Sequence, residues 1–258
     1  MMQLMRTQKI NSMSLTEKNL REKDFHNELQ SRPKGRFENI FYKAIANIWD
    51  DFYESLKNNS RNAEVLDYGC GVGPSIIKVS NYGPKKITGI DISEISIKKA
   101  KDKTEYLGSM VELKVDNCEK TSFKNNQFDL IYGHGILHHL EFSKCLDEIL
   151  RILRPGGSLV FVEPLGTNPV INLYRKLTPK SRSIDEHPFT SKDLILLKNK
   201  YKDVEIKYYG FLTLIFFPFY LNPNESKLFK ILKNFDQILF KIKLFRYFAW
   251  SILISARK

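Results

Sequence analysis

Cysteine is scarce in this 258-residue sequence. The three cysteines, Cys70, Cys118 and Cys145, lie far apart, and no C-x-x-C pair or Cys/His group has the spacing of metal ligands. An odd count without a disulfide pattern fits a reducing compartment. We therefore expect a cytoplasmic protein without a metal site.

Long apolar runs are also lacking. Residues 1–23 have no apolar segment like that of a signal peptide. The longest apolar stretch, Phe211–Leu221, contains Pro218 and falls well short of the roughly 20 residues of a membrane span. With 42% hydrophobic residues, the chain can instead build the packed core of one α/β domain.

Acidic residues are outnumbered, with 29 Asp and Glu against 41 Lys and Arg, giving a formal net charge of +12. A basic balance is typical of proteins that bind nucleic acid or anionic membranes. Basic residues spread over solvated faces give the same composition, and we favour that interpretation. We therefore expect no nucleic-acid partner.

The order of apolar patterns predicts an α/β architecture. Residues 1–36 are polar and predict a loose or helical N-terminal arm, and residues 37–57 have the spacing of an amphipathic helix. Strands are then predicted at 64–68, 86–90, 111–115, 128–132 and 158–162, with helices near 75–82, 93–107 and 141–153. Strands that alternate with helices imply a mostly parallel sheet with helices on both faces.

The pattern becomes less regular after Pro164. It predicts a helix at 191–200, a strand at 203–211, a basic amphipathic helix at 224–243 and a last strand at 250–256. Two late strands separated by a long insertion predict an antiparallel edge on the sheet. We therefore expect one domain over 37–258, with a core at 60–164 and cap segments at 165–200 and 212–248.

The segment VLDYGCGVGP, residues 65–74, is the most informative in the chain. A buried strand enters a turn with glycines at 69, 71 and 73, which let the backbone bend sharply and approach a ligand closely. Pro74 suits the first turn of a following helix. Because Pro74 replaces the third glycine of the dinucleotide fingerprint, the segment argues against NAD or FAD. Asp67 is placed to meet a cationic amino group.

Polar residues end the neighbouring strands. Asp91 follows the second strand about 20 residues after the glycine turn, where a carboxylate can accept hydrogen bonds from a ribose diol. Asp116 follows the third strand, where it can accept from an adenine amino group. The fourth strand ends at Gly133 and His134, and the fifth follows a turn predicted at 153–157.

Five segments together resemble class I S-adenosylmethionine-dependent methyltransferases. They are VLDYGCGVG, TGIDIS, VDNCE, FDLIYGHGILHHL and LRPGGSLVFVEP, and they occur in the family's order over about residues 60–164. The resemblance implies a Rossmann-like sheet of seven strands whose last strand is antiparallel. The later segments EPLGTNP, N-x-Y-R and DEHP resemble a methyltransferase type 11-like subgroup that acts on small molecules.

The same resemblance implies a binding site for S-adenosylmethionine. Asp67, Gly69, Gly71 and Gly73 would border its methionine part, with Cys70 in the same turn. Asp91 and Ile92 would bind the ribose, and Gly133 and His134 would flank the methionine end. The adenine would meet Asp116, Asn117 and Cys118.

Methyl transfer to oxygen or nitrogen benefits from a general base near the strand ends. The candidate catalytic residues are His138, His139, Glu163 and His187. Each has a plain structural alternative: neighbouring histidines on a helix point in different directions, and Glu163 can simply orient backbone. The absence of the motif Asn-Pro-Pro-Tyr lowers the expectation of an amino-DNA acceptor.

The sequence leaves the acceptor open. A small molecule of partly apolar character, methylated on oxygen, carbon or nitrogen, is favoured because the segment 211–248 is rich in aromatic and aliphatic residues. The alternatives are an RNA or protein methyltransferase that uses the basic surface, and a non-catalytic cofactor-binding protein. The helix at 224–243 either caps the acceptor pocket, which we favour, or contacts a membrane surface.

Overall fold

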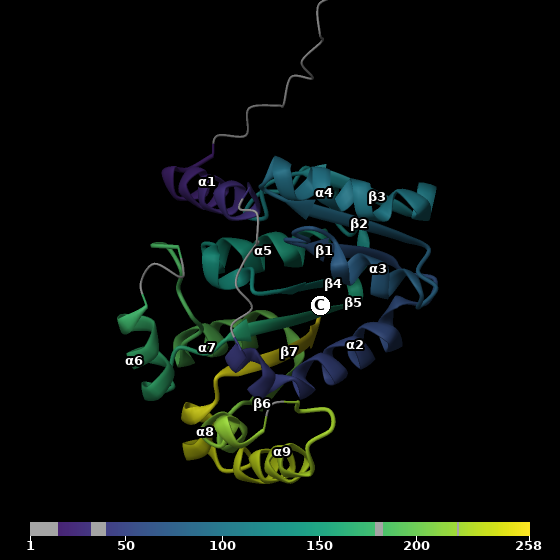
Figure 1. Ribbon diagram of the computed structural model, residues 1–258. Coiled ribbons are helices and arrows are strands. Elements are labelled where there is room, and N and C mark those ends of the chain that lie inside the picture. Colours follow the sequence, from purple (N-terminus) through teal and green to yellow (C-terminus); the bar gives the residue numbers. More distant parts are fainter. Residues whose placement is uncertain (1–14, 32–39, 179–182, 221) are drawn as a thin grey trace, which may run out of the picture.

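One mixed sheet organises the computed structural model, which describes residues 15–31, 40–178, 183–220 and 222–258 (Figure 1). Its strand order is β3-β2-β1-β4-β5-β7-β6, and β7 runs antiparallel to both of its neighbours. The strands are β1 (Glu64–Tyr68), β2 (Lys86–Asp91), β3 (Val111–Val115), β4 (Phe128–His134), β5 (Leu153–Pro164), β6 (Lys202–Tyr209) and β7 (Ser251–Arg257). The predicted mostly parallel sheet with an antiparallel last strand is confirmed.

Helices cover both faces of the sheet, as the alternating sequence pattern requires. The α-helices are α1 (Glu17–Ser31), α2 (Asn47–Ser60), α3 (Pro74–Ser80), α4 (Glu94–Thr104), α5 (Phe142–Ile152), α6 (Pro169–Leu177), α7 (Ser191–Lys200), α8 (Leu212–Ile215) and α9 (Lys227–Leu239). The 3-10 helices are η1 (Ile40–Ile45), η2 (Glu105–Met110), η3 (Leu137–His139), η5 (Phe217–Phe219) and η6 (Lys243–Phe248).

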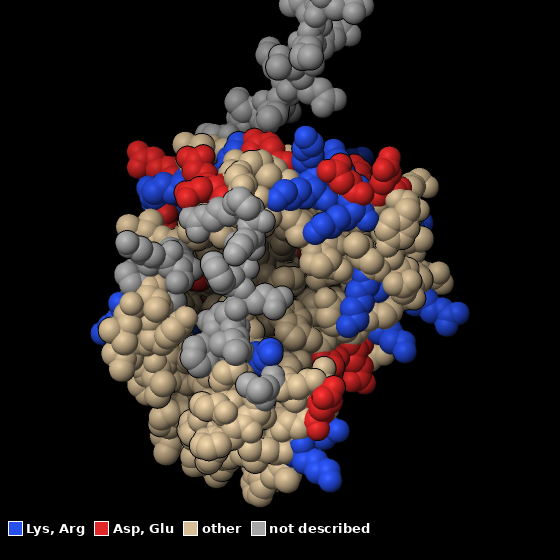
Figure 2. Space-filling model, viewed as in Figure 1, with Lys and Arg blue, Asp and Glu red and all other residues tan. Residues whose placement is uncertain are grey.

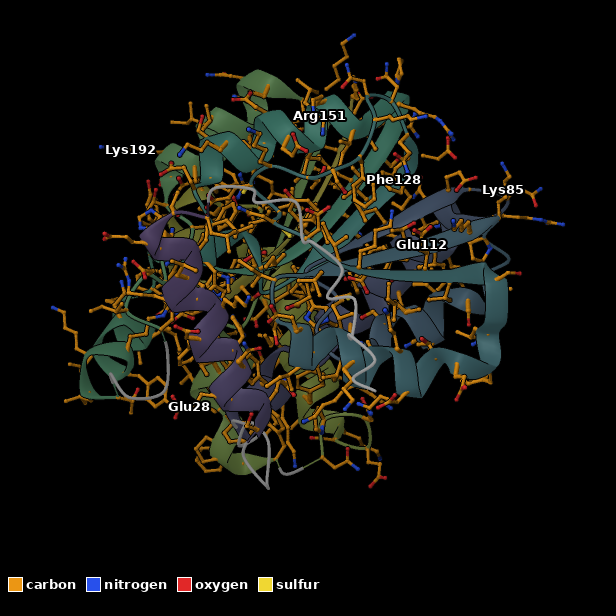
Figure 3. The ribbon with its side chains drawn as sticks, turned by 90° about the horizontal axis from the view of Figure 1, so that it is seen from above. Glu28, Lys85, Glu112, Phe128, Arg151 and Lys192 are labelled. Atoms are coloured by element: carbon orange, nitrogen blue, oxygen red, sulfur yellow. The ribbon has the colours of Figure 1, made fainter. Side chains whose placement is uncertain are left out.

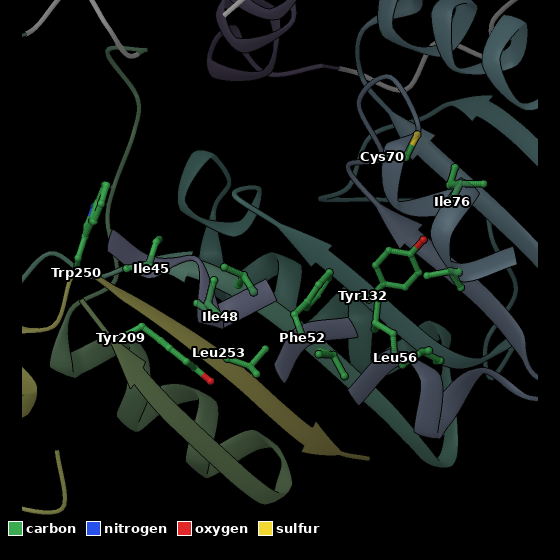
Figure 4. Packing of buried hydrophobic residues seen from close by; sticks show 14 of the residues in the cluster. Ile45, Ile48, Phe52, Leu56, Cys70, Ile76, Tyr132, Tyr209, Trp250 and Leu253 are labelled. Atoms are coloured by element: carbon green, nitrogen blue, oxygen red, sulfur yellow. The ribbon is translucent and has the colours of Figure 1, made fainter. Parts of the chain in front are cut away.

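Two apolar clusters hold the sheet between these layers. Phe52 of α2 and Ile76 of α3 belong to one cluster, part of which Figure 4 shows around Tyr132. Ile149 of α5 and Leu197 of α7 belong to the cluster on the other face. Successive strand residues enter opposite clusters because side chains alternate along a strand, and this buries the central strands on both sides.

The predicted helix at 37–57 is divided in the structure. Phe37 lies outside the described residues, η1 covers Ile40–Ile45, and α2 continues from Asn47 to Ser60. Figure 1 places η1 and α2 beside the sheet, and α2 packs on β4, β5 and β7. The segment therefore lies on the domain, as its periodicity indicates.

Residues 153–157 are not a separate turn but the start of β5, which corrects the sequence prediction. Phe128 pairs with Leu153 and Leu130 pairs with Ser158, so the register shifts between these two pairs. The extra residues form an irregularity within the strand, and Gly156 has a positive φ of 76° there. A bulge of this kind and a turn can use the same Pro and Gly residues, which is why the sequence pattern predicted a turn here.

The helix at 191–200 is confirmed as α7, whereas α6 was not predicted. Its signal is local: the Asn168 side chain accepts hydrogen bonds from the backbone N–H groups of Val170 and Ile171, and Pro169 opens the first turn.

The favoured expectation that the apolar side of the 224–243 helix is buried is wrong for most of its residues. On α9, Phe229 and Leu232 are buried, but five other large apolar residues in and just after the helix are between 36% and 57% exposed. These are Leu228, Ile231, Phe235, Ile238 and Ile242. The helix therefore has two apolar stripes, one facing the domain and one facing outward. Among the described helices, none has the length and apolarity to cross a membrane.

Candidate functional site

The glycine turn after β1 lies across the end of β2. The backbone N–H groups of Gly69 and Cys70 donate to the Ile90 carbonyl at 2.9 and 2.8 Å. Gly69 has a φ of +78°, and a Cβ on it would lie 2.6 Å from Ile136 Cγ1, so only glycine fits there. A Cβ on Gly71 would meet no atom within 4 Å. The turn therefore presents open space at Gly71 beside a tightly packed Gly69.

Asp67, at the end of β1, is a buried carboxyl group with an unused oxygen. It is 2% exposed, and its Oδ2 has no hydrogen-bond partner among the described residues. Burial raises the pKa of Asp67 to about 8, although the nearby Tyr132 hydroxyl opposes the rise. A cation next to this carboxyl group would stabilise its ionised form. This is the group that an ammonium ligand would complete.

Asp91, at the end of β2, connects the glycine turn to α4. Its two oxygens accept hydrogen bonds from the backbone N–H of Gly71 at 2.9 Å and of Ser93 at 2.8 Å. Burial raises the pKa of Asp91 despite these two donors. Because a carboxylate offers about four lone-pair positions, Asp91 can still accept from a diol in front of the turn. The next residue, Ile92, is only partly buried.

The three residues after β3 form a closed turn. Asp116 accepts from the Ser122 hydroxyl at 2.8 Å and from the Ser122 backbone N–H at 3.0 Å. The Cys118 carbonyl accepts from the Tyr68 hydroxyl, and burial raises the pKa of the Cys118 thiol. Asn117 donates through Nδ2 to Asn19 Oδ1 of α1 at 3.2 Å. This turn therefore shapes the edge of the site and connects it to α1.

Gly133 and His134 end β4 under α2. A Cβ on Gly133 would lie 2.6 Å from the Tyr68 carbonyl oxygen, so a larger residue would disturb β1. The His134 ring makes edge-to-face contacts with Trp49 and Phe52, with ring centroids 5.3 and 6.3 Å away. Burial lowers the pKa of His134. His134 is therefore held as a neutral ring in an aromatic setting.

His138 and Glu163 form a buried polar pair in the site. Glu163 is 0% exposed and accepts from the backbone N–H of Leu137 at 2.8 Å and from His138 Nδ1 at 2.6 Å. The other ring nitrogen of His138, Nε2, lies 3.1 Å from Glu186 Oε1. Burial lowers the pKa of His138, but the two carboxylates outweigh this and raise the pKa to about 9. His138 is thus positioned between carboxylates from β5 and from the 183–187 segment.

The remaining two catalytic candidates lie in different surroundings. His139 is 6% exposed, and its Nδ1 lies 3.1 Å from Glu22 Oε2 of α1. The side chain of His187 is 63% exposed and points to the surface near Asp193, with 3.6 Å between Nε2 and Oδ2. Only the backbone of His187 reaches the buried pair, because its N–H donates to the His138 carbonyl at 2.6 Å. The structure therefore brings His138, His139 and Glu163 together and leaves the His187 side chain outside.

Helix α1 crosses the carboxyl edge of the sheet. Figure 3, seen from above, shows α1 with Glu28 on the opposite side of the molecule from Lys85, which directly precedes β2. Asn27 Oδ1 accepts from the Ser93 hydroxyl at 2.6 Å, and Arg21 makes two 2.8 Å hydrogen bonds to Asp185. The surface below α1 and α4 is hollowed in Figure 2. This helix is therefore a wall of the site, although the polar arm of the sequence gave no sign of it.

Glu22, His26 and Glu186 are site residues that sequence reasoning missed. Glu186 belongs to the DEHP segment, which marked the region without identifying this residue. Glu22 and His26 are four residues apart, a spacing that puts both on one face of a helix. That spacing was the available signal, but it is common and gains meaning only when the face is known.

The comparisons with known proteins agree with this geometry. A family model described as a methyltransferase domain matches residues 66–161, which contain the glycine turn, Asp91 and the His138 segment. Over these residues the chain is similar to a methyltransferase domain. The match covers less than half of the chain and leaves out α1, α2 and the segments after β5.

Curated relatives match the methyltransferase domain and part of its surroundings. A demethylmenaquinone methyltransferase of Lactiplantibacillus plantarum is 35% identical over 133 residues, covering 50% of this chain and 56% of that protein. A sterol 4-C-methyltransferase of Caenorhabditis elegans is 30% identical over 112 residues, covering 42% of this chain and 33% of that protein. The chain thus spans less than two thirds of the length of these relatives.

Solved structures share the fold over a larger part of the chain. Geranyl diphosphate C-methyltransferase from Streptomyces coelicolor A3(2) aligns with a TM-score of 0.65 and 13% identity, covering 94% of this chain and 98% of that one. The [4+2]-cyclase SpnF aligns with a TM-score of 0.56 and 18% identity, covering 81% of both chains. At these identities the likeness concerns the fold, which is shared by proteins named for different reactions.

Proposed function

We propose that this chain is an S-adenosylmethionine-dependent methyltransferase that acts on a small molecule of partly apolar character. The observation that carries the proposal is Asp67, a buried carboxyl group with an unused oxygen at the end of β1. It lies on the strand that leads into the open glycine turn, and Asp91 lies at the end of the next strand.

The residues present fit this methyl donor. Asp67 suits a cationic amino group, the open space at Gly71 suits close approach of a ligand, and Asp91 suits the ribose hydroxyls. Of the other expected contacts, Cys70, Gly73 and Ile92 belong to the turns around these groups. Gly133 and His134 border the donor end, while Asp116, Asn117 and Cys118 form the adenine side.

The bound donor would supply an electrophilic methyl group on a sulfonium. The protein's part is to align the acceptor, exclude water and hold charge in place, because positioning accounts for much of the rate of such a displacement. We assign the acceptor side to His138, whose ring is fixed by Glu163 and Glu186. His139 stands beside it, and His187 contributes its backbone, with its exposed ring as a weaker candidate.

The proposed class of acceptor rests on the surroundings of His138 and Glu163. Segment 183–187 lies against His138, and segment 165–168 is hydrogen-bonded to 247–250, so the cap segments 165–200 and 212–248 pack together. Curated relatives named for demethylmenaquinone and for a sterol act on apolar molecules. An apolar small molecule is therefore favoured over RNA or protein. Helix α1, from the predicted 1–36 arm, forms one wall of the proposed site.

Binding of S-adenosylhomocysteine to the full chain tests the donor assignment. We expect affinity in the low-micromolar range or tighter, about 8 kcal/mol by isothermal titration. Gly71→Arg should abolish binding because the arginine side chain fills the open space. Gly83→Arg changes a glycine in a different turn, outside the site, and should leave binding unchanged. A folded wild-type chain that does not bind would rule out the methyltransferase and leave a different reaction on this fold.

We also infer that the outward stripe of α9 contacts an anionic membrane surface. Further exposed apolar residues surround the stripe: Ile215, Phe216, Phe219, Leu244 and Tyr247. The residues over α8 and α9 form a largely uncharged region in Figure 2. Lysines border it at 227, 230, 233, 241 and 243, whereas residues 211–250 contain only two acidic residues, Glu225 and the buried Asp236. Apolar side chains framed by lysines are typical of helices that lie in a lipid interface.

Co-sedimentation with lipid vesicles tests this contact. We expect binding to phosphatidylcholine vesicles that contain phosphatidylserine, weaker binding without phosphatidylserine, and weakening with salt. Ile231→Ser with Phe235→Ser should reduce binding, while Ile195→Ser, an exposed apolar residue on α7, should not. Equal binding by both variants, or a concentration-dependent dimer without vesicle binding, would overturn the membrane assignment.

A further inference from the structure

Two residues of α1 and one residue of η3 bring possible metal ligands together at the face of α1 that meets the domain. The side chains of Glu22, His26 and His139 each offer one donor atom, and these atoms all lie within 4.8 Å of one another. Glu22 and His139 are buried, at 4% and 6% exposure. The sequence predicts no metal site, because the ligand spacing runs through more than a hundred residues and becomes visible only in the fold.

Two of these donor atoms lack a hydrogen bond. Glu22 Oε2 and His139 Nδ1 face each other at 3.1 Å as an ion pair, but neither atom has a partner with hydrogen-bond geometry among the described residues. His26 Nε2 approaches the same oxygen at 3.7 Å. Buried polar atoms are nearly always paired, so unpaired atoms that converge on one point indicate a missing partner. A cation between them would satisfy these two atoms, and His26 Nε2 is close enough to be a third ligand.

The surrounding residues orient this group as the outer contacts of a metal site do. Ser183 donates to Glu22 Oε1, which leaves Oε2 to face the histidines. The rings of His26 and His139 lie with centroids 5.3 Å apart and planes at 77°, so they meet edge to face. His138 and Glu186 lie beside His139 as a second group of donors. Hydrogen bonds that hold a carboxylate in one orientation are typical of metal centres.

The donor set selects the kind of ion. Two imidazoles and one carboxylate suit zinc, which accepts nitrogen and oxygen ligands and keeps a fourth position for water or another ligand. Magnesium and calcium prefer oxygen ligands and fit this set poorly. We propose that Glu22, His26 and His139 bind one zinc ion, which fixes α1 across the carboxyl edge of the sheet.

Such an ion would connect α1 to the site that α1 covers. Helix α1 already reaches the β3 turn through Asn19 and the start of α4 through Asn27. With two ligands on α1 and one on η3, zinc would join the helix to the segment that also carries His138. The proposal concerns metal binding alone and holds whether or not the donor assignment is correct.

Zinc titration of the full, chelator-treated chain tests the proposal. We expect one zinc ion per chain, no displacement by magnesium, and a higher thermal midpoint when zinc is present. His26→Ala, which changes a partly exposed ring, and Glu22→Gln should each weaken zinc binding about 100-fold or more. His187→Ala removes an exposed histidine outside the group and should bind zinc like the wild type.

Cobalt substitution identifies the ligands independently. We expect the visible bands of a nitrogen- and oxygen-ligated Co²⁺ ion, without the charge-transfer band of a thiolate, because Cys70, Cys118 and Cys145 lie outside the group. Circular dichroism of each variant establishes that it is folded. A thiolate band, no retained zinc, or unchanged zinc affinity in folded His26→Ala would each overturn the site.

Discussion

At the scale of single residues, the burial of Asp67 lowers the free energy of unfolding of the chain at neutral pH. Its carboxyl group is fully buried, and burial raises its pKa to about 8 from an ordinary value near 3.8. Between these two values the folded chain holds a proton on Asp67 that the unfolded chain has released. The free energy of unfolding therefore falls as pH rises through this window. A ligand cation would remove that cost.

Asp67→Asn should be less sensitive to pH than the wild type over this window. An amide cannot ionise, so the wild type should lose up to about 1.4 kcal/mol per pH unit relative to the variant. Urea unfolding at about pH 5 and about pH 8 measures the difference. Asp102→Asn, at an exposed position of α4, is the control. Parallel pH curves for wild type and Asp67→Asn would mean that Asp67 is ionised in the folded chain.

Asp91→Ala should weaken S-adenosylhomocysteine binding by about 1.5–3 kcal/mol, the scale of hydrogen bonds to a charged group. The fold should survive because Asp91 lies at a strand end and the Ser93 side chain still caps α4. Isothermal titration beside Asp102→Ala gives the measurement. Unchanged affinity in a folded variant would show that Asp91 only holds the glycine turn.

At the scale of elements, one buried carboxylate joins the late helices. Asp236 of α9 accepts from the backbone N–H of Leu212 at 2.7 Å and of Phe211 at 3.2 Å, and from the Thr213 hydroxyl at 2.9 Å. These donors open α8, a helix of only four residues whose first N–H groups have no partners within the helix. Asp236 therefore fixes α8 to α9.

Asp236→Ala should lower the free energy of unfolding by about 1–3 kcal/mol, because it leaves several buried donors unpaired. Asn234→Ala, at an exposed position two residues away on the same helix, is the matched control. Urea unfolding followed by circular dichroism compares the two. Equal stability would show that water replaces the carboxylate and that α8 is not held by this contact.

At the scale of the whole molecule, the site is assembled from every layer. Asp67 and Asp91 lie at strand ends, and His138 lies on η3, directly before α5. Helix α1 covers the carboxyl edge of the sheet. A ligand that contacts all of these groups stabilises the folded chain, because it binds the assembled site and not its separate parts.

S-adenosylhomocysteine should therefore raise the thermal midpoint of the full chain. At a concentration 100 times its dissociation constant, the stabilisation is about 2.7 kcal/mol, or roughly 5–10 °C for a domain of this size. Differential scanning fluorimetry gives the shift, and adenosine with methionine added separately is the control. A midpoint that does not move would contradict the proposed donor.

The sequence by itself determined the sheet and the grouping of the glycine turn with Asp67 and Asp91. Strands and helices follow local periodicity, and the glycine turn with Asp67 and Asp91 follows from short segments whose neighbours in the chain are also neighbours in space. Most strand boundaries were predictable because buried strands are apolar on both faces. Residues 153–157 were not, since a bulge and a turn use the same residues.

Only the tertiary structure decided the surroundings of His138 and His139. Glu22, His26, Glu163 and Glu186 reach His138 and His139 from elements that are separated by long stretches of sequence. No local pattern specifies which face of α1 or of the 183–187 segment turns inward. The same holds for α9, whose two apolar stripes look like one broad face until packing buries one and exposes the other. Periodicity fixes which residues share a face, but only packing decides what that face meets.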